Sequence, residues 1–313
     1  MEPGFWRKKD LAQAWISEAS NVIVINNLCV SYVYPEKKVI HLCQIGLSEA
    51  PAWIEDCKTG FRMGLDEGQG MLVQPKIYRK IKDIDGAGFT ADYQQVKNSH
   101  PELAVRLDNT ANSFYMSYIH DPSKLAEFIA MAALIDGDQE TLILTNQDSS
   151  FLEAPESKAL LVDARISKIE YTDLKVPAPN GNSMIERSFN DEPRLDKIVR
   201  VIRLPRILNH EQYLSLFFYS KPVVGVTGNS TLFHAIAMGK LPFYAQNLEI
   251  QSEVNQQLAD LDKTGKLKPF FNNKASPLIK ADVFRKYSEE ISSWAKWIVE
   301  NRSLSQVVVK KML

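Results

Sequence analysis

The stretch that decides the fold is Lys221-Pro-Val-Val-Gly-Val-Thr-Gly-Asn-Ser-Thr-Leu-Phe-His-Ala-Ile-Ala-Met-Gly-Lys-Leu-Pro-Phe-Tyr244. Residues 223–226 are apolar and rich in β-branched side chains, which predicts a buried strand. Residues 232–237 present an apolar helical face, and Gly239 is suited to end that helix. A second apolar run begins at residue 241. The stretch therefore predicts a strand, a tight turn, a helix and a second strand.

The turn between the first strand and the helix has a chemical consequence. Gly228 gives the freedom in φ that a sharp strand-to-helix turn needs, and Asn229 and Ser230 are side chains that can cap the helix. The N–H groups at the start of such a helix lie at the carboxyl edge of a parallel sheet, where an anion binds well. The sequence therefore predicts an anion site at residues 228–231.

Working outward, strands alternate with helices through the second half of the chain. In the first half of the chain we expect strands at residues 22–25 and 39–43 and mostly loop in the glycine-rich residues 61–70. In the second half we expect strands at residues 113–119, 141–145, 166–171 and 199–204, helices at 121–135, 209–219 and 251–261, and a long C-terminal helix with an apolar face from Phe284 to Ile298. Such alternation indicates a parallel sheet with right-handed crossovers. Residues 85–112 are polar and weakly patterned, so we place a domain boundary near residue 110. This predicts two domains, residues 1–110 and 111–313.

Composition excludes several classes of protein. Hydrophobic residues make up 45% of the 313-residue chain, which excludes general disorder. Lys and Arg number 37 against 38 Asp and Glu, so bulk charge does not favour a nucleic-acid or membrane-surface partner. The first residues lack the apolar core of a signal peptide, and no apolar run approaches the roughly 20 residues of a membrane span. We expect a protein without a transmembrane segment in the cytoplasm, with secretion lacking a cleaved signal left open.

The sequence also resembles a known superfamily. Residues 228–242, preceded by the helix expected from residue 207 and followed by Gln251 and Asn255, are similar to the nucleotide-binding half of GT-B-type glycosyltransferases. The likeness covers roughly residues 112–300 and is nearest to the bacterial N-acetylglucosaminyltransferases of peptidoglycan-precursor synthesis. This chain has His234 where that family often has Glu. It also has one extra residue in the segment that ends at Pro242 and another between Gln251 and Asn255.

The resemblance implies a fold and a reaction. The fold would be α/β, with two Rossmann-like domains facing a cleft, a reduced N-terminal domain and a long C-terminal helix that ties the two together. The reaction would be metal-independent transfer of a sugar from a nucleotide-diphosphate donor, most naturally a UDP-sugar, to an unknown glycan, lipid or protein acceptor. The nucleotide sugar is a co-substrate, and no cofactor is expected.

Candidate site residues follow from the motif and the resemblance together. The diphosphate candidates are the helix start and arginines at the end of the strand at 199–204, because an arginine fork suits phosphate. The resemblance adds contacts to the base and to sugar hydroxyls. The donor-binding candidates are Arg203, Leu204, Arg206, Gly228, Asn229, Ser230, Thr231, His234, Glu249, Gln251 and Asn255. His41, or Asp66 or Glu67 in a glycine-rich segment, could be the general base.

Other interpretations remain open at this point. The chain could be a non-catalytic descendant of the same fold that binds a protein or a glycan, or an epimerase that acts on a UDP-sugar without an acceptor. Asp-x-Asp patterns begin at Asp83, Asp136 and Asp260, but none follows a strand as a metal site of a glycosyltransferase would require, so we expect no metal site. The cysteines Cys29, Cys43 and Cys57 match no zinc or redox spacing.

Overall fold

The structure is a computed structural model that describes residues 21–25, 38–43, 60–62, 65, 71, 73, 75–83, 88–109, 114–174, 183–189, 197–204, 208–246 and 248–303. The chain divides into two compact units. One unit consists of Met1–Met71 together with Arg302–Leu313, and the other is Leu72–Asn301. Each unit has its own sheet.

The first unit contains a three-stranded parallel sheet. Its strands are β1 (Asn21–Ile25), β2 (Lys38–Cys43) and β3 (Gly60–Arg62), in the order β1-β2-β3. The first two confirm the strands that we expected at residues 22–25 and 39–43. The third lies in the glycine-rich segment that we expected to be mostly loop.

The second unit alternates strands with helices, as the sequence predicts. Its strands are β4 (Phe114–Tyr118), β5 (Thr141–Thr145), β6 (Lys168–Asp173), β7 (Ser183–Ser188), β8 (Ile198–Arg203), β9 (Val223–Val226) and β10 (Leu241–Tyr244). Its helices are α3 (Pro75–Ile81), α4 (Thr90–Ser99), α5 (Pro101–Asn109), α6 (Pro122–Asp136), η1 (Ser149–Leu152), α7 (Pro155–Asp163), α8 (His210–Tyr219), α9 (Asn229–Ala237), α10 (Leu248–Asp260), α11 (Lys268–Phe271) and α12 (Pro277–Arg302). Helix α12 is kinked at Tyr287.

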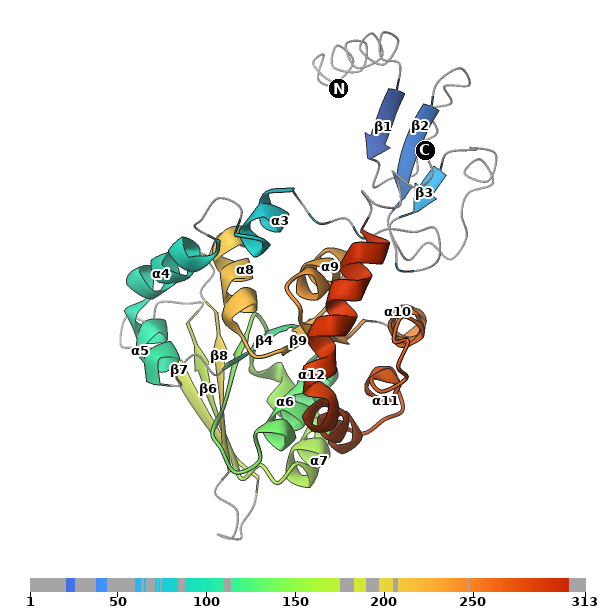
Figure 1. Ribbon diagram of the computed structural model, residues 1–313. Helices are drawn as coiled ribbons and strands as arrows, with labels where there is room; N and C mark the ends of the chain where they lie inside the picture. Colours follow the sequence, from blue (N-terminus) through green and yellow to red (C-terminus); the bar gives the residue numbers. More distant parts are fainter. Residues whose placement is uncertain are drawn as a thin grey trace, which may run out of the picture. The chain divides into compact units, whose positions relative to one another are not determined.

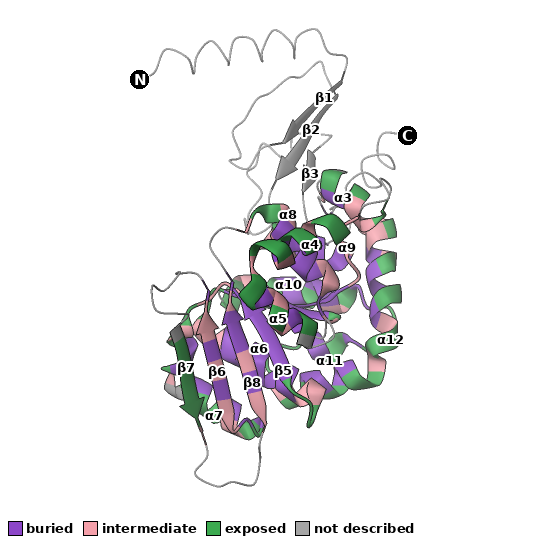
Figure 2. Cartoon of the chain, turned by 90° about the vertical axis from the view of Figure 1, so that its left-hand side faces the viewer, coloured by how far each residue is buried: buried purple, intermediate pink, exposed green. Residues whose placement is uncertain are grey.

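These strands form one seven-stranded sheet in the order β10-β9-β4-β5-β8-β6-β7. All neighbours are parallel except β7, which runs antiparallel to β6. The second unit is therefore an α/β fold with a mostly parallel sheet, consistent with a Rossmann-like arrangement. In Figure 2, β6, β7 and β8 lie at one edge of this sheet, and residues 184–188 of β7 are exposed.

The order of the strands decides which face each helix covers. From β4 the chain continues to β5 on one side, and it later crosses to β9 and β10 on the other side. Because parallel crossovers are right-handed, α6 and α7 must cover one face while α8 and α9 cover the opposite face. Figure 1 shows α6 and α7 on the side of the sheet away from α4, α5 and α8.

The middle of the sheet is the core of this unit. Strands β5, β9 and β10 are buried at every position, and α6 buries eight residues from Leu125 to Ala133. Glycine is required within β9, because a Cβ on Gly225 would lie 2.7 Å from Cδ1 of Ile119 and 2.9 Å from Oγ of Ser117. Strands β4 and β9 therefore pack closely at their carboxyl ends.

Helices α3 to α5 belong to the second unit, although the sequence suggested a boundary near residue 110. Phe89, just before α4, stacks on Phe218 of α8 at 5.3 Å between ring centroids, and Tyr93 stacks on Tyr219 at 4.5 Å. Because α4 and α5 are short and mainly polar, the few apolar residues that hold them against α8 do not form a recognisable sequence pattern. The structural division therefore falls earlier in the chain than expected, at residue 72.

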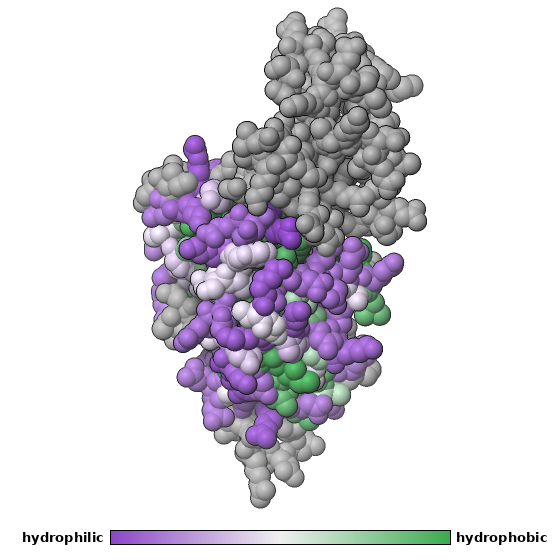
Figure 3. All heavy atoms as spheres, turned by 45° about the vertical axis from the view of Figure 1, so that its right-hand side comes forward, coloured by the Kyte–Doolittle hydropathy of each residue, from purple (hydrophilic) through white to green (hydrophobic). Residues whose placement is uncertain are grey.

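The surface of the second unit is mainly polar. In the view of Figure 3, hydrophilic side chains dominate the described surface and hydrophobic ones form small patches. The exposed large apolar side chains are Tyr78, Val105, Met184, Ile185, Leu248, Leu278 and Ile279. In the described part of the chain, no helix combines the length and hydrophobicity needed to cross a bilayer.

Candidate functional site

The candidate site lies where β4 and β9 end side by side. Tyr118, the last residue of β4, is the register partner of Val226, the last residue of β9. The chain leaves β4 for α6 on one face of the sheet and leaves β9 for α9 on the other. In open α/β sheets, ligands bind at such a divergence, outside the carboxyl ends of the strands. We call this place, between the ends of β4 and β9, the crevice.

The helices that begin at this edge differ in how their first turns are capped. Asp121 caps α6 by accepting hydrogen bonds from the backbone N–H groups of Ser123 and Lys124, at 2.9 and 3.1 Å. Asn209 and Gln212 form a capping box at the start of α8. Helix α9, in contrast, has Gly228 as its N-cap and no capping side chain.

This finding corrects one expectation from the sequence, which assigned the cap of α9 to Asn229 and Ser230. The first backbone bond within α9 is donated by Leu232 to the carbonyl oxygen of Gly228, at 3.1 Å. The amides of Ser230 and Thr231 precede that bond, and Gly228 has no side chain to accept from them. The first turn of α9 is therefore not capped by the side chain of its N-cap residue, and the positive end of its dipole favours an anion.

The space in front of the α9 start is open. Gly228 has φ of +82°, which is favourable only for glycine, and a Cβ placed on it would meet no atom of the described residues within 4 Å. Ser230 is exposed, and Thr231 is partly exposed. The structure therefore brings Gly228, Asn229, Ser230 and Thr231 together at an accessible helix start, as the sequence predicts.

His234 lies one turn further along α9 and is 2% exposed. Neither of its ring nitrogens has a hydrogen-bond partner among the described residues, and its ring centroid lies 5.8 Å from that of His210, the first residue of α8. Burial, with a smaller effect of His210, lowers the pKa of His234 to about 4. An unpaired buried polar group costs roughly 1–3 kcal/mol, so this neutral imidazole needs a functional or structural reason.

A row of aromatic rings borders the same crevice and was not found from the sequence. His120, in the connection between β4 and α6, lies edge-on to Tyr118 with ring centroids 4.7 Å apart. Tyr118 in turn meets Tyr213 of α8 at 5.6 Å, also edge-on. No motif marks these residues, and only the strand order places them opposite the start of α9.

Arg203 lies at the same edge but is bound to neighbouring groups. Its Nη1 contacts Oδ2 of Asp173 at 2.8 Å, and its Nε donates to the carbonyl oxygen of Asn146 at 3.4 Å. Burial opposes the charge of Arg203, but the hydrogen bond that it donates to Asp173 raises its pKa overall. Leu204 is buried, and its N–H donates to Thr145. Arg206 lies outside the described residues.

Sheet register gives the separation between Arg203 and Gly225, which lies three residues before the N-cap of α9. Gly225, Ser117, Thr145 and Arg203 form one row across four neighbouring strands. Three strand spacings of ~4.8 Å place the ends of this row about 14 Å apart. An extended nucleoside diphosphate could span that distance along the carboxyl edge.

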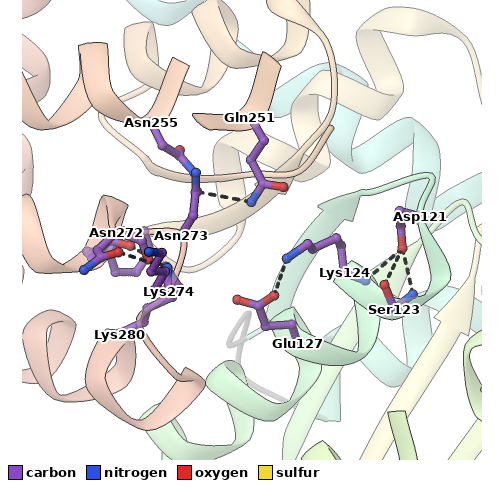
Figure 4. Close-up of polar contacts among 11 residues, drawn as sticks. Asp121, Ser123, Lys124, Glu127, Gln251, Asn255, Asn272, Asn273, Lys274 and Lys280 are labelled. Carbon is purple, nitrogen blue, oxygen red and sulfur yellow. Dashed lines mark hydrogen bonds and ion pairs between the residues drawn. The ribbon is translucent and has the colours of Figure 1, made fainter. Parts of the chain in front are cut away.

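The side-chain amides that we expected to contact the sugar, Gln251 and Asn255, lie beyond β10 and both donate to Asn273. Figure 4 shows Gln251 and Asn255 of α10 directed at Asn273, whose Oδ1 accepts from Nε2 of Gln251 at 3.5 Å and from Nδ2 of Asn255 at 2.5 Å. Oε1 of Gln251 is buried without a described partner. The cavity beside them is about 10 Å³, which is room for one water molecule. Glu249 is exposed in the first turn of α10.

Lysine side chains organise the neighbourhood of this amide cluster. Lys280 of α12 is buried, and its Nζ donates to the carbonyl oxygens of Phe270 and Asn272 at 2.7 and 2.8 Å. Burial lowers the pKa of Lys280 to about 8. On α6, Lys124 is paired with Glu127 at 2.8 Å (Figure 4). Lys280 therefore anchors the start of α12, a role that no sequence motif signals.

The candidates for a general base fall in the first unit. His41 lies in β2 as the register partner of Val24 and Gly60, and its side chain is not among the described features. Asp66 and Glu67 lie outside the described residues. Within the ranges that the structure describes, no group of three or more His, Cys, Asp or Glu side chains could hold a metal ion.

A larger hollow, of about 160 Å³, lies elsewhere in the second unit. It is lined by Leu261, Asp262, Lys263, Thr264, Leu267, Glu290, Ser293, Trp294 and Trp297. These residues come from α12 and from the end of α10 through to α11, and none comes from the carboxyl ends of β4 or β9. Topology and helix capping instead favour the crevice as the candidate site.

Comparisons with known proteins identified no family for this chain. A scan against models of protein families found no match, and a search of curated proteins found no similar sequence. The site must therefore be interpreted from its own residues.

Proposed function

We propose that the second unit binds a nucleoside-diphosphate sugar at the carboxyl ends of β4 and β9 and that the protein is a glycosyltransferase. The observation that carries this proposal is the start of α9, which lacks a capping side chain at the point where the sheet topology reverses. The buried, unpaired imidazole of His234 beside it supports the same site.

The chemistry of the helix start favours a diphosphate over a single carboxylate. The end charge of a helix contributes only about 0.3–1 kcal/mol to binding one anion, so several donors must act together. The amides of Ser230 and Thr231, together with their hydroxyls, offer such a set of donors. A diphosphate, with acceptor oxygens on two phosphorus atoms, matches this set better than a carboxylate does.

In the proposed reaction, an acceptor oxygen or other nucleophile attacks the anomeric carbon of the donor sugar. The new glycosidic bond forms as the bond from that carbon to the diphosphate oxygen breaks, and the nucleoside diphosphate leaves with the electron pair. The proton of the acceptor passes to a base, for which His41, Asp66 and Glu67 remain the candidates. The start of α9 would stabilise the charge that develops on the leaving diphosphate.

The two-domain GT-B arrangement and a UDP donor are part of this proposal. The first unit would then supply the acceptor side of the cleft. Support comes from the strand-turn-helix-strand segment at residues 223–244, which has the element order that the resemblance implies. The parallel sheet around it is also of the expected kind.

Calorimetric titration with a panel of UDP-, GDP- and dTDP-sugars tests the proposal. We expect one nucleotide class to bind with micromolar affinity, and we expect the double variant Ser230→Ala/Thr231→Ala to bind it at least tenfold more weakly. Release of the nucleoside diphosphate in the presence of candidate acceptors would then establish transfer. If no member of the panel binds, or if the double variant binds as the wild type does, the donor site is not at α9.

A further inference from the structure

His120 occupies a special position at the crevice. It lies in the connection of residues 119–121 that leaves β4, while residues 227–228 leave β9. These two connections start from a directly paired set of residues, Tyr118 and Val226, and diverge to opposite faces. His120 is therefore on the β4 side of the crevice, opposite the start of α9.

The imidazole of His120 is both held and accessible. Its ring rests edge-on against Tyr118 at 4.7 Å, with the two ring planes 76° apart, and Tyr118 is itself held edge-on by Tyr213. His120 is nevertheless exposed. Aromatic contacts of this kind orient a side chain without using its nitrogen atoms, which stay available to a ligand.

The two connections at the crevice contain one side chain that can become positively charged and one carboxylate. The two connections consist of Ile119, His120, Asp121, Thr227 and Gly228, and of these only His120 can become positively charged. The carboxylate of Asp121 already accepts three hydrogen bonds from Ser123 and Lys124. The remaining ionisable groups on β4, the first two turns of α6 and α8, and α9 are Tyr115, Tyr118, Lys124, Glu127, His210, Glu211, Tyr213 and His234. Tyr115 is buried and donates to Asp136. Lys124 is paired with Glu127, and Glu211 with Lys76 and Lys80.

We propose that His120 is a donor-binding residue whose protonated imidazole contacts the diphosphate held at the start of α9. This inference rests on the proposed function and extends it by one residue and by a pH dependence. Histidine changes charge between pH 5 and 8, and a hydrogen bond from a charged donor to a phosphate oxygen is stronger than a neutral one. Donor affinity is therefore highest at low pH and falls as the imidazole loses its proton.

The test uses whichever nucleotide sugar binds in the panel above, titrated into the full-length protein at pH 5.5 and pH 8.0. Each phosphate of a nucleotide sugar carries one ester and the shared anhydride bond and keeps only a strongly acidic hydroxyl, so the charge of the diphosphate stays constant over this range. We expect the wild type to bind about fivefold more tightly at pH 5.5. His120→Gln should lose this difference, and His120→Arg should bind tightly at both pH values because its charge is permanent.

His100→Gln, at the end of α4, is the matched control and should keep the pH dependence of the wild type. Because His120 is exposed, the thermal unfolding of its variants should match that of the wild type and so exclude a folding defect. If the wild type binds equally well at both pH values, or if His120→Gln keeps the dependence, the assignment of His120 is wrong while the donor site stands. If no nucleotide sugar binds at all, the proposed function fails and this inference fails with it.

Discussion

At the scale of single residues, the crevice depends on Gly225, which has no side chain. Gly225 lets Ile119 and Ser117 of the neighbouring β4 chain approach the backbone of β9. Ile119 begins the connection that carries His120. The packing at Gly225 therefore helps to fix the position of one wall of the crevice.

We predict that Gly225→Ala destabilises the protein by about 1–3 kcal/mol, because the added methyl group has no room beside Cδ1 of Ile119. Urea unfolding followed by circular dichroism measures this loss. The double variant Gly225→Ala/Ile119→Val removes the clashing Cδ1 and should be less destabilised than the sum of the two single variants. Additive losses would show that the contact between Ile119 and Gly225 is not the cause.

At the scale of elements, α9 combines an uncapped start with a buried histidine in its second turn. Burial holds the pKa of His234 at about 4, whereas a histidine in the unfolded chain titrates near 6.5. The unfolded state therefore takes up a proton between these pH values that the folded state does not. The free energy of unfolding therefore falls as the pH falls from about 6.5 to about 4, because protonation of His234 favours the unfolded state.

We predict that the wild type loses up to about 3 kcal/mol of stability, relative to His234→Leu, as the pH falls from 7 to 4. Denaturant titrations at intervals of half a pH unit give the two curves. His100→Gln serves as the control and should follow the wild type. If wild type and His234→Leu run parallel over the whole range, the imidazole of His234 is not held neutral in the folded state.

The strongly patterned elements could be predicted from the sequence, and the weakly patterned ones could not. The strands β4, β5, β8, β9 and β10 are apolar runs bounded by turns, and the structure confirms them. The sequence missed β7 because residues 184–188 are exposed on both faces and so show no alternation. It also missed α4, which buries only Tyr93 and Val96.

Only part of the candidate site could likewise be predicted from the sequence. The glycine turn and the helix start at residues 228–231 have local signals and were predicted. The partner of Arg203 was not predicted, because Asp173 lies on another strand and no local pattern joins the two. His120 was missed for a similar reason, since its place beside α9 depends on the order of strands across the whole sheet.

At the scale of the whole molecule, the division into units can be tested with fragments. Residues 72–110 contribute buried side chains, including Ile77, Phe89 and Val96, and a hydrophobic cluster joins Ile77 and Phe89 to Leu214 of α8. Each fully buried side chain of this size stabilises the fold by about 1.5–3 kcal/mol. Removal of this segment would expose the surface of α8 that it covers.

We predict that a fragment of residues 72–303 unfolds cooperatively and that a fragment of residues 111–303 is less stable by several kcal/mol or does not fold. Thermal unfolding and the near-ultraviolet circular dichroism of both fragments measure this difference. Equal stability of the two fragments would place the boundary near residue 110, as the sequence alone suggested.

The central claim is that the start of α9 binds a diphosphate, and charge reversal at Ser230 tests it most directly. A carboxylate in the first turn interacts favourably with the helix dipole but repels a bound anion. Calorimetric titration of the nucleotide sugar into Ser230→Glu should show a loss of at least tenfold in affinity with stability unchanged or slightly raised, whereas Ser252→Glu, at an exposed position of α10, should bind as the wild type does. Undiminished binding by Ser230→Glu would contradict the account.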